Sequence, residues 1–148
     1  MNKQNNFLTV TNSKGFETII TSGKHTWRSD EPLDAGGTDT GPTPYDILLS
    51  ALGSCKAITM RMYSLRKNFS VDAITIKLHH NKIYAEDCDD CETKVGKIDI
   101  VNVEISFTGN LTDGEKKRLL EIAEKCPVHK TLVSEIKINT KLENKILI

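Results

Sequence analysis

The sequence predicts an α+β fold built mainly from antiparallel sheets. Three observations support this: one long stretch with helical periodicity, several short segments of alternating apolar and polar residues, and a second helical region near the C-terminus. The expected order is βββ-α-ββ-αα-β, in which strands follow one another rather than alternate with helices. A chain of 148 residues without an internal repeat is typical of one domain, which we expect to span residues 1–148.

The composition argues against several classes of partner. Lys plus Arg and Asp plus Glu are balanced at 20 each, so we expect no nucleic-acid partner and no acidic membrane surface. The N-terminal residues lack an apolar signal region, and no apolar run reaches the length of a membrane span. These features predict a cytoplasmic protein. Four cysteines in that compartment are typical of reduced, catalytic or metal-bound thiols.

The first thirty residues carry strand signals separated by turns. We expect strands at residues 5–11, 16–21 and 25–28, with a turn at residues 12–15, which together form an antiparallel meander. Residues 30–42 then form a long loop that contains two of the four prolines and three of the nine glycines. A loop of this length inside a compact domain is usually functional or mobile.

A helix is expected over residues 43–69. Thr43 can cap it, Pro44 suits the first helical position, and Asp46 completes a capping-box pattern. Apolar or small residues recur in steps of three and four and predict one interior stripe, which consists of Leu48, Ala51, Leu52, Cys55, Thr59, Met62 and Tyr63. Cys55 is therefore expected to face the interior.

Two strands with an exposed acidic turn between them should follow this helix. Residues 71–83 and 98–107 alternate between apolar and polar side chains, with a change of phase that indicates a bulge near Ile100. The polar residues 84–97 should form the turn, and they include Cys88 and Cys91.

The C-terminal region predicts two helices and a last strand. Thr112 with Glu115 forms a second capping box before a helix at residues 113–125. Pro127 suits the first position of a short helix over residues 127–133. Residues 136–142 alternate again and predict the final strand.

Cys55 and Cys126 are the candidate reactive residues. A cysteine in an apolar helical stripe is often just a small buried hydrophobe, and this alternative stays open for Cys55. Cys126 should sit at the cap of the short helix, where backbone N–H groups stabilise a thiolate. His129 lies three residues on and could reach back toward the sulfur or remain a solvated surface histidine. A pair that forms and breaks a disulfide is geometrically reasonable, although sequence alone does not fix their separation.

The other candidates have alternatives as well. Cys88-x-x-Cys91 suggests zinc ligands, with His79 and His80 completing the site, or a redox pair, or incidental thiols at an acidic hairpin tip. The last interpretation is favoured, so we expect no metal and no other cofactor. Arg28 and Arg61 are available cations, with solvated positions as their alternative.

Three segments of this chain resemble the OsmC-like branch of the OsmC/Ohr superfamily. They are GPTPYDILLSALGSCKAITMRMYSLRK, DCDDCETKVGKID and LLEIAEKCPVHKTL, and the similarity covers roughly residues 24–142. The specific combination is a Gly-Pro-x-Pro helix start with a downstream cysteine, followed later by Cys-Pro-Val-His. This resemblance implies an intertwined homodimer in which sheets wrap long central helices.

The resemblance also implies an activity and roles for individual residues. Peroxidases of the family reduce organic hydroperoxides with two cysteines that a dithiol reductant regenerates. By position, Cys55 matches the peroxide-attacking cysteine and Cys126 the resolving one. Family members of the hydroperoxide-resistance branch have a glutamate where this chain has Tyr45, followed by Asp46, and they use an arginine from an early strand. Here Lys14 lies in the corresponding hairpin, and Arg28 is the only arginine before the long helix.

Two main hypotheses result for the function. The first is a thiol peroxidase that acts on organic hydroperoxides in oxidative stress defence. The second is a non-catalytic binding or redox-sensing protein for an apolar or thiol ligand, which Tyr45 in place of the glutamate favours. A zinc-dependent role of Cys88 and Cys91 is a third alternative.

Overall fold

A computed structural model describes residues 7–143 of the chain, which group into two compact units. One unit contains the described residues up to Ser54 together with Ile76–Ile105. The other contains Cys55–Thr75 together with the described residues from Ser106 onward. The α+β class and the element order βββ-α-ββ-αα match the prediction. The assignment of one domain to residues 1–148 stays a prediction.

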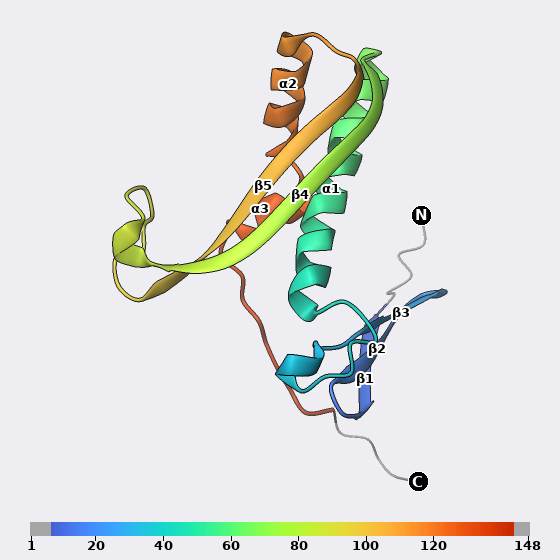
Figure 1. Cartoon of the computed structure of the whole chain (residues 1–148), viewed down its shortest axis with the longest axis vertical. Helices are drawn as coiled ribbons and strands as arrows, with labels where there is room; N and C mark the ends of the chain where they lie inside the picture. The colour runs from blue at the N-terminus through green and yellow to red at the C-terminus, as the bar shows by residue number, and fades with distance from the viewer. Residues whose placement is uncertain (1–6, 144–148) are drawn as a thin grey trace. The chain divides into compact units, whose positions relative to one another are not determined.

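The first unit begins with a three-stranded antiparallel sheet, as the sequence predicts (Figure 1). Its strands are β1 (Leu8–Lys14), β2 (Glu17–Ser22) and β3 (His25–Ser29), while residues 5 and 6 of the predicted first strand lie outside the described residues. Gly15 turns the chain with a φ of +61°, which a residue without a Cβ adopts at little cost. The Asn12 amide donates to the carbonyls of Gly15 and Glu17 at 2.9 and 2.8 Å, which fixes this turn.

The loop after β3 is organised around the buried carboxylate of Asp30. This side chain is 2% exposed. It accepts hydrogen bonds from the hydroxyls of Thr38 and Thr40 at 2.6 and 2.9 Å and from the backbone N–H groups of Glu31, Thr38 and Thr40. The Thr38 hydroxyl and these other donors hold the pKa of Asp30 far below its ordinary value, although burial opposes them. The loop, with its short 3₁₀ turn η1 (Leu33–Ala35), therefore has a defined polar centre.

Helix α1 (Pro44–Lys67) confirms the predicted long helix and its capping box. The Asp46 carboxylate accepts from the N–H and hydroxyl of Thr43 at 3.0 and 2.8 Å, and the Asp46 N–H returns to the Thr43 hydroxyl at 3.2 Å. The predicted interior stripe is only partly correct, because Leu48, Ala51 and Met62 are exposed and Cys55, Thr59 and Tyr63 are partly buried. The buried line runs in steps of four through Leu52, Lys56, Met60 and Ser64.

Strands β4 (Ser70–Tyr84) and β5 (Lys97–Asn110) pair in a two-stranded sheet, with the turn η2 (Ala85–Asp87) after β4 (Figure 1). In the first unit, Gly53 of α1 lies against Leu78 of β4. A Cβ at this position would come within 2.8 Å of the leucine Cδ1, so the glycine permits the close approach. The alternation of burial along β5 changes phase between Ile100 and Val103, where the sequence indicates a bulge.

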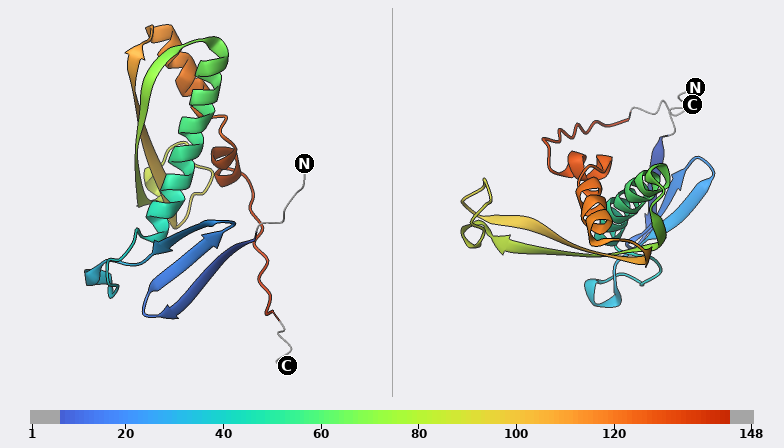
Figure 2. Two further views of the ribbon diagram at one scale, coloured as in Figure 1. Left: turned by 90° about the vertical axis from the view of Figure 1, so that its right-hand side faces the viewer. Right: turned by 90° about the horizontal axis from the view of Figure 1, so that it is seen from above.

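Helices α2 (Asp113–Ala123) and α3 (Pro127–Leu132) belong to the second unit, in which α2 lies beside the C-terminal half of α1 (Figure 2). The Thr112–Glu115 capping box forms as predicted. The core of this unit includes side chains with 0% exposure, namely Met60, Leu119, Ala123 and Cys126.

The predicted last strand is wrong. The described residues that follow Ser134 have no regular secondary structure, and Ile136, Ile138 and Leu142 are 51%, 83% and 88% exposed. An alternating pattern becomes a strand only where a sheet edge accepts its backbone hydrogen bonds, and no strand among residues 7–143 pairs with this segment. Within the same described range, no helix has the length and apolar character needed to cross a membrane.

Candidate functional site

Cys126 occupies the N-cap of α3, as the sequence predicts. Its backbone is extended at φ −61° and ψ 136°, and Pro127 occupies the first helical position. The Cys126 sulfur accepts a hydrogen bond from the backbone N–H of His129 at 3.3 Å, which is the bond that a serine or threonine oxygen makes at most helix starts. The side chain is fully buried. The end of α2, the proline and this capping bond thus fix the direction of the sulfur.

Cys55 lies on α1 in the same unit, and its thiol is free and partly buried. Its sulfur contacts the Cys126 side chain, the backbone N–H of Val128 and the Thr59 hydroxyl. The Thr59 hydroxyl also lies 2.7 Å from the Cys55 carbonyl oxygen, so its single proton serves either the carbonyl or the sulfur at one time. The two free cysteines of the chain therefore face each other in one cluster.

These contacts shift the pKa values of the two thiols in opposite directions. Burial opposes ionisation of Cys55, but the Val128 N–H, the Cys126 thiol, the Thr59 hydroxyl and the charge of Lys56 together lower its pKa. Burial is the main cause of the raised pKa of Cys126, and contact with the Cys55 sulfur adds to it. The directions of the two pKa shifts favour Cys55 as the thiolate of the pair and Cys126 as the protonated thiol.

Lys56 is a functional candidate that the sequence did not reveal. It is 1% exposed, and its Nζ contacts the Ala123 carbonyl at 3.2 Å, Glu124 Oε1 at 3.0 Å and His129 Nδ1 at 3.1 Å. The only available signal is its position four residues after Leu52 on the buried line of α1. A buried ammonium requires such partners, and it places a positive charge next to the Cys55 position.

His129 takes part in the site in a different way from the one expected. Its backbone N–H, and not its ring, contacts the Cys126 sulfur. The ring nitrogens instead face Lys56 Nζ at 3.1 Å and Glu124 Oε2 at 3.4 Å. His129 thus links the sulfur cap of α3 to the buried lysine of α1.

Arg28, Tyr45 and Asp46, which the sequence suggests as supporting residues, belong to the other unit, where each has its own partner. Arg28 pairs with Glu17 at 3.4 Å, with both side chains well exposed. The Tyr45 ring stacks on His80 at a centroid distance of 4.5 Å, and His80 Nε2 lies 2.8 Å from Asp99 Oδ1. Asp46 is engaged in the cap of α1.

Two further cations of the sequence have structural positions. Arg61 donates to the backbone carbonyls of Val71 and Asp72, which ties α1 to the start of β4 within the second unit. Lys14 stands opposite Glu17 at the end of β1.

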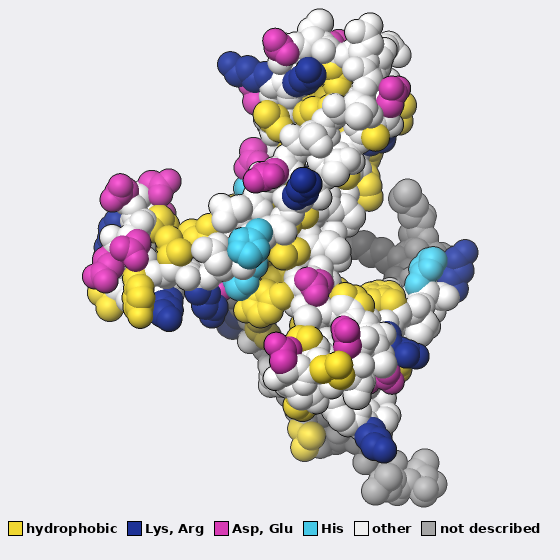
Figure 3. All heavy atoms as spheres, viewed as in Figure 1, with side chains coloured by type: hydrophobic (Ala, Val, Ile, Leu, Met, Phe, Trp, Pro, Cys, Tyr) yellow, Lys and Arg dark blue, Asp and Glu magenta, His cyan; other side chains and the backbone are white. Residues whose placement is uncertain are grey.

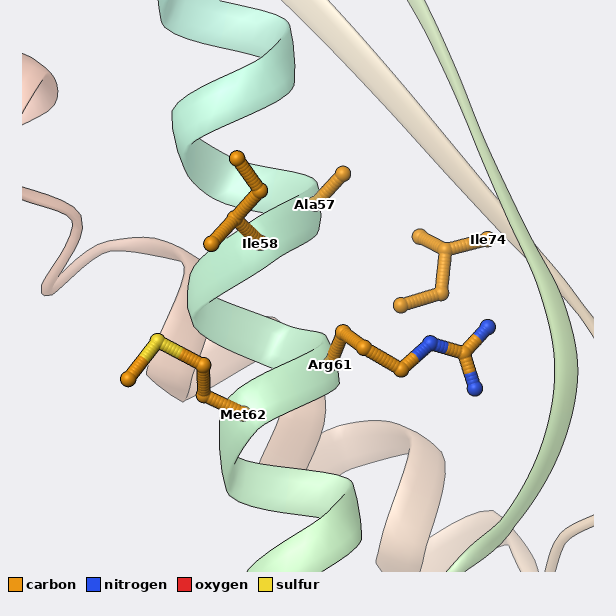
Figure 4. A pocket seen from close by; sticks show the side chains of 5 residues that line it. All are labelled: Ala57, Ile58, Arg61, Met62 and Ile74. Carbon is orange, nitrogen blue, oxygen red and sulfur yellow. The ribbon is translucent and has the colours of Figure 1, made fainter.

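A shallow pocket of about 270 Å³ lies on the second unit (Figure 4). Its walls come from α1 and β4 and consist of Ala57, Ile58, Arg61, Met62 and Ile74. In Figure 4 the Arg61 guanidinium extends toward the strand that carries Ile74, while Ile58 and Met62 extend from another side of the helix. The surface is mainly apolar, with one cation that is already bound to carbonyls.

Cys88 and Cys91 form a disulfide at the end of the β4–β5 hairpin, with a Cα separation of 5.5 Å. The favoured interpretation as incidental free thiols is therefore wrong, because the two cysteines are bonded to each other. Their sulfurs and the Asp90 carboxylate lie within 4.8 Å of one another. His79 and His80, the proposed additional zinc ligands, are not part of this group among the described residues. Acidic side chains gather around this tip in Figure 3.

Comparison with known proteins gives a family match and a common fold. The family model described as OsmC-like protein matches residues 37–141. A solved OsmC-like protein of Mycoplasma pneumoniae is 18% identical, with 89% of each chain covered and a TM-score of 0.67. The organic hydroperoxide resistance protein OhrB of Bacillus subtilis is 21% identical over 86% of this chain and 90% of its own, with a TM-score of 0.58.

A third solved structure is that of an osmotic stress induced and detoxification response protein from Psychrobacter arcticus. It is 20% identical, covers 84% of this chain and 85% of its own, and has a TM-score of 0.67. At these identities the solved structures show a shared fold. A comparison with curated proteins produced no match.

Proposed function

Because the chain belongs to the OsmC-like protein family, we propose that it is a thiol-dependent peroxidase that reduces organic hydroperoxides. In this proposal Cys55 attacks the peroxide and Cys126 resolves the product. Similar structures include organic hydroperoxide resistance proteins from Legionella pneumophila and Bacillus subtilis, which supports the class of substrate. A cytoplasmic location and a dithiol reductant belong to the same proposal.

The observation that carries this proposal is the contact between two free thiols with opposite pKa shifts. A peroxide is attacked by a thiolate and not by a thiol, and the lowered pKa of Cys55 favours its thiolate. The raised pKa of Cys126 favours its protonated thiol, so Cys55 rather than Cys126 would attack the peroxide. The Cys126 side chain is also a direct neighbour of the Cys55 thiol, which supports a disulfide between them.

The chemistry proceeds in three balanced steps. The Cys55 thiolate attacks one peroxide oxygen, the O–O bond breaks, and the alkoxide takes a proton to leave as an alcohol, so that Cys55 becomes a sulfenic acid. The Cys126 sulfur then attacks the Cys55 sulfur, and the hydroxyl group leaves as water with the proton of the Cys126 thiol. A dithiol finally reduces the Cys55–Cys126 disulfide and is itself oxidised to a disulfide.

Lys56 and Val128 would support the first step. The Val128 N–H and the Lys56 charge both favour the Cys55 thiolate, a task for which the related hydroperoxide-resistance branch uses an arginine. Burial of the ammonium against Ala123, Glu124 and His129 would hold that charge in place. Lys56 is thus the cation that we assign to the site in place of Arg28.

Thiol titration and mass spectrometry after treatment with cumene hydroperoxide test the proposal. The treated protein should lose two free thiols and contain a Cys55–Cys126 disulfide, and it should consume peroxide continuously when a dithiol is supplied. Cys55→Ser should abolish consumption, whereas Cys126→Ser should still form a sulfenic acid that a 1,3-dione probe traps. Full activity of Cys55→Ser, or the absence of the Cys55–Cys126 disulfide, would refute the assignment.

We further propose that the protein is a homodimer, as its resemblance to the family implies. The supporting observation is an apolar surface on α1, where Ile58, Met62 and Leu65 are 59%, 67% and 68% exposed. Large apolar side chains clustered on one surface usually mark an interaction site. Sedimentation equilibrium should give twice the mass of the chain, and a monomer at micromolar concentration would count against it.

A second candidate function is a binding or redox-sensing protein for an apolar or thiol ligand. Two observations favour it: Tyr45 stands where related peroxidases have a glutamate, and its ring is stacked on His80; and the pocket beside Met62 is mainly apolar. Steady-state peroxide consumption distinguishes the candidates, because a binding protein would show none beyond uncatalysed thiol oxidation.

A further inference from the structure

The Cys88–Cys91 disulfide has no part in the chemistry proposed for Cys55 and Cys126. It joins two residues that are separated by three positions, and it lies in the short segment between β4 and β5. Both sulfurs belong to the first unit, whereas the two free cysteines belong to the second. The disulfide therefore requires an explanation of its own.

Structural stabilisation is a poor explanation for this disulfide. The base of the tip is already closed by a hydrogen bond from the Ala85 N–H to the Gly96 carbonyl at 2.8 Å, and the Cys88 N–H bonds to the Ala85 carbonyl at 3.2 Å. Ala85 is 1% exposed and anchors the turn. A crosslink within so few residues removes little entropy from the unfolded chain, and here it connects no separate elements.

The tip is accessible and strongly acidic. Cys88 and Cys91 are both partly exposed, and Asp90 Oδ1 lies 3.4 Å from the Cys88 sulfur. Residues 84–97 contain five carboxylates, at Glu86, Asp87, Asp89, Asp90 and Glu92, against two lysines. Figure 3 shows acidic side chains gathered on the surface of the hairpin end. Such a surface attracts a positively charged reaction partner and repels an anionic one.

We propose that Cys88–Cys91 is a second thiol–disulfide exchange site, which accepts two electrons from a positively charged dithiol. A thiolate of the reductant attacks one sulfur, the Cys88–Cys91 bond breaks, and the released cysteine takes a proton from water. The second thiol of the reductant then attacks the mixed disulfide. The products are two cysteine thiols at the tip and one disulfide in the oxidised reductant, so electrons and atoms balance.

The test uses the full chain with Cys55→Ser and Cys126→Ser, so that the tip is the only source of thiols. Cysteamine serves as a cationic thiol probe and glutathione as an anionic one, and maleimide labelling followed by mass spectrometry measures the released cysteines. The matched variant adds Asp89→Asn and Asp90→Asn. For each probe, the rate of reduction of the parent protein is compared with the rate for the aspartate variant. The intrinsic reactivity of the probe therefore does not affect the ratio of the two rates.

Neutralising the two aspartates should slow reduction by cysteamine roughly three-fold or more at low salt and should accelerate reduction by glutathione. Both differences should shrink near 1 M salt, where the screening length is about 3 Å. Identical rates in the two proteins, or a disulfide that is reduced only after unfolding, would overturn the proposal.

The Cys88→Ser/Cys91→Ser variant tests the alternative of a structural crosslink. Its melting temperature should stay within a few degrees of the parent, because the backbone bonds of Ala85 and Gly96 remain. A loss of the folded hairpin in this variant would overturn the exchange proposal in favour of a crosslink. Since the exchange assay contains neither Cys55 nor Cys126, its failure would leave the proposed peroxidase untouched, and the reverse also holds.

Discussion

The Lys56 ammonium lies 3.1 Å from Nδ1 of His129, although 73 positions separate the two residues. The neighbour of Cys55 in the sequence is thereby bound to the helix that begins at Cys126. The Ala123 carbonyl and the Glu124 carboxylate complete the surroundings of the ammonium. A polar cluster thus joins α1, which carries Cys55, to α3, which begins at Cys126.

Replacement of Cys126 should change both the pKa of Cys55 and the stability of the protein. Cys126→Ala should raise the pKa of Cys55, because the Cys126 thiol is one of the donors that lower it. It should also cost about 1 kcal/mol of stability through loss of the α3 cap. The pH dependence of Cys55 alkylation by iodoacetamide measures the first effect, and urea unfolding measures the second. Cys126→Ser keeps a donor and a cap, so it should change both quantities much less.

Replacement of Lys56 should affect reactivity more than stability. In Lys56→Met the charge that favours the Cys55 thiolate is absent, so alkylation of Cys55 should require a higher pH. The free energy of unfolding should change by less than about 2 kcal/mol. The variant loses the ion pair, but folding no longer has to remove an ammonium group from water. Lys130→Met removes an exposed charge and is the control. An unchanged pH profile in Lys56→Met would exclude the role assigned to this lysine.

The buried Asp30 predicts a pH-dependent stability of the first unit. Its carboxyl pKa in the folded chain lies below the ordinary value of 3.8, so it stabilises the fold fully above that pH and loses its effect as the pH falls further. Asp30→Asn should therefore lower the urea midpoint clearly at pH 7, with a difference that narrows below pH 3.8. The exposed Asp34 offers the matched control Asp34→Asn. Equal midpoints for wild type and Asp30→Asn at pH 7 would contradict the expectation.

The capping box of α2 should contribute measurably to the second unit. Thr112 accepts from the Glu115 N–H at 3.2 Å, and the Glu115 carboxylate accepts from the Thr112 N–H at 2.7 Å. Thr112→Ala should lower the free energy of unfolding by about 1 kcal/mol, measured by urea denaturation. Thr93→Ala, in the exposed hairpin tip, should have little effect. If the two variants unfold alike, the cap is not stabilising.

Local sequence signals predicted the helix ends well. Thr43 with Asp46 and Thr112 with Glu115 cap their helices as their spacing indicates, and Cys126 before Pro127 begins α3. These features depend on residues within one turn of each other, so a short window of sequence contains all the information they need.

Features that depend on distant partners were predicted poorly. The burial of Lys56 depends on carbonyl and side-chain groups almost seventy residues away, and a lysine without such partners would be solvated. The central role of Asp30 requires the later threonines of its loop to fold back on it. Residues 136–142 have the alternation of a strand, but no neighbouring strand of the described chain accepts their hydrogen bonds.

The hydrogen bond at the N-cap of α3 provides a way to monitor the oxidation state of Cys126 by NMR. The His129 amide donates directly to the Cys126 sulfur, and a thiol, a thiolate and a disulfide sulfur differ in how strongly they accept a hydrogen bond. The amide resonance of His129 should therefore change with the oxidation state of Cys126. This resonance then reports the oxidation state of Cys126 in solution, in isotope-labelled protein and without a dye attached to either cysteine.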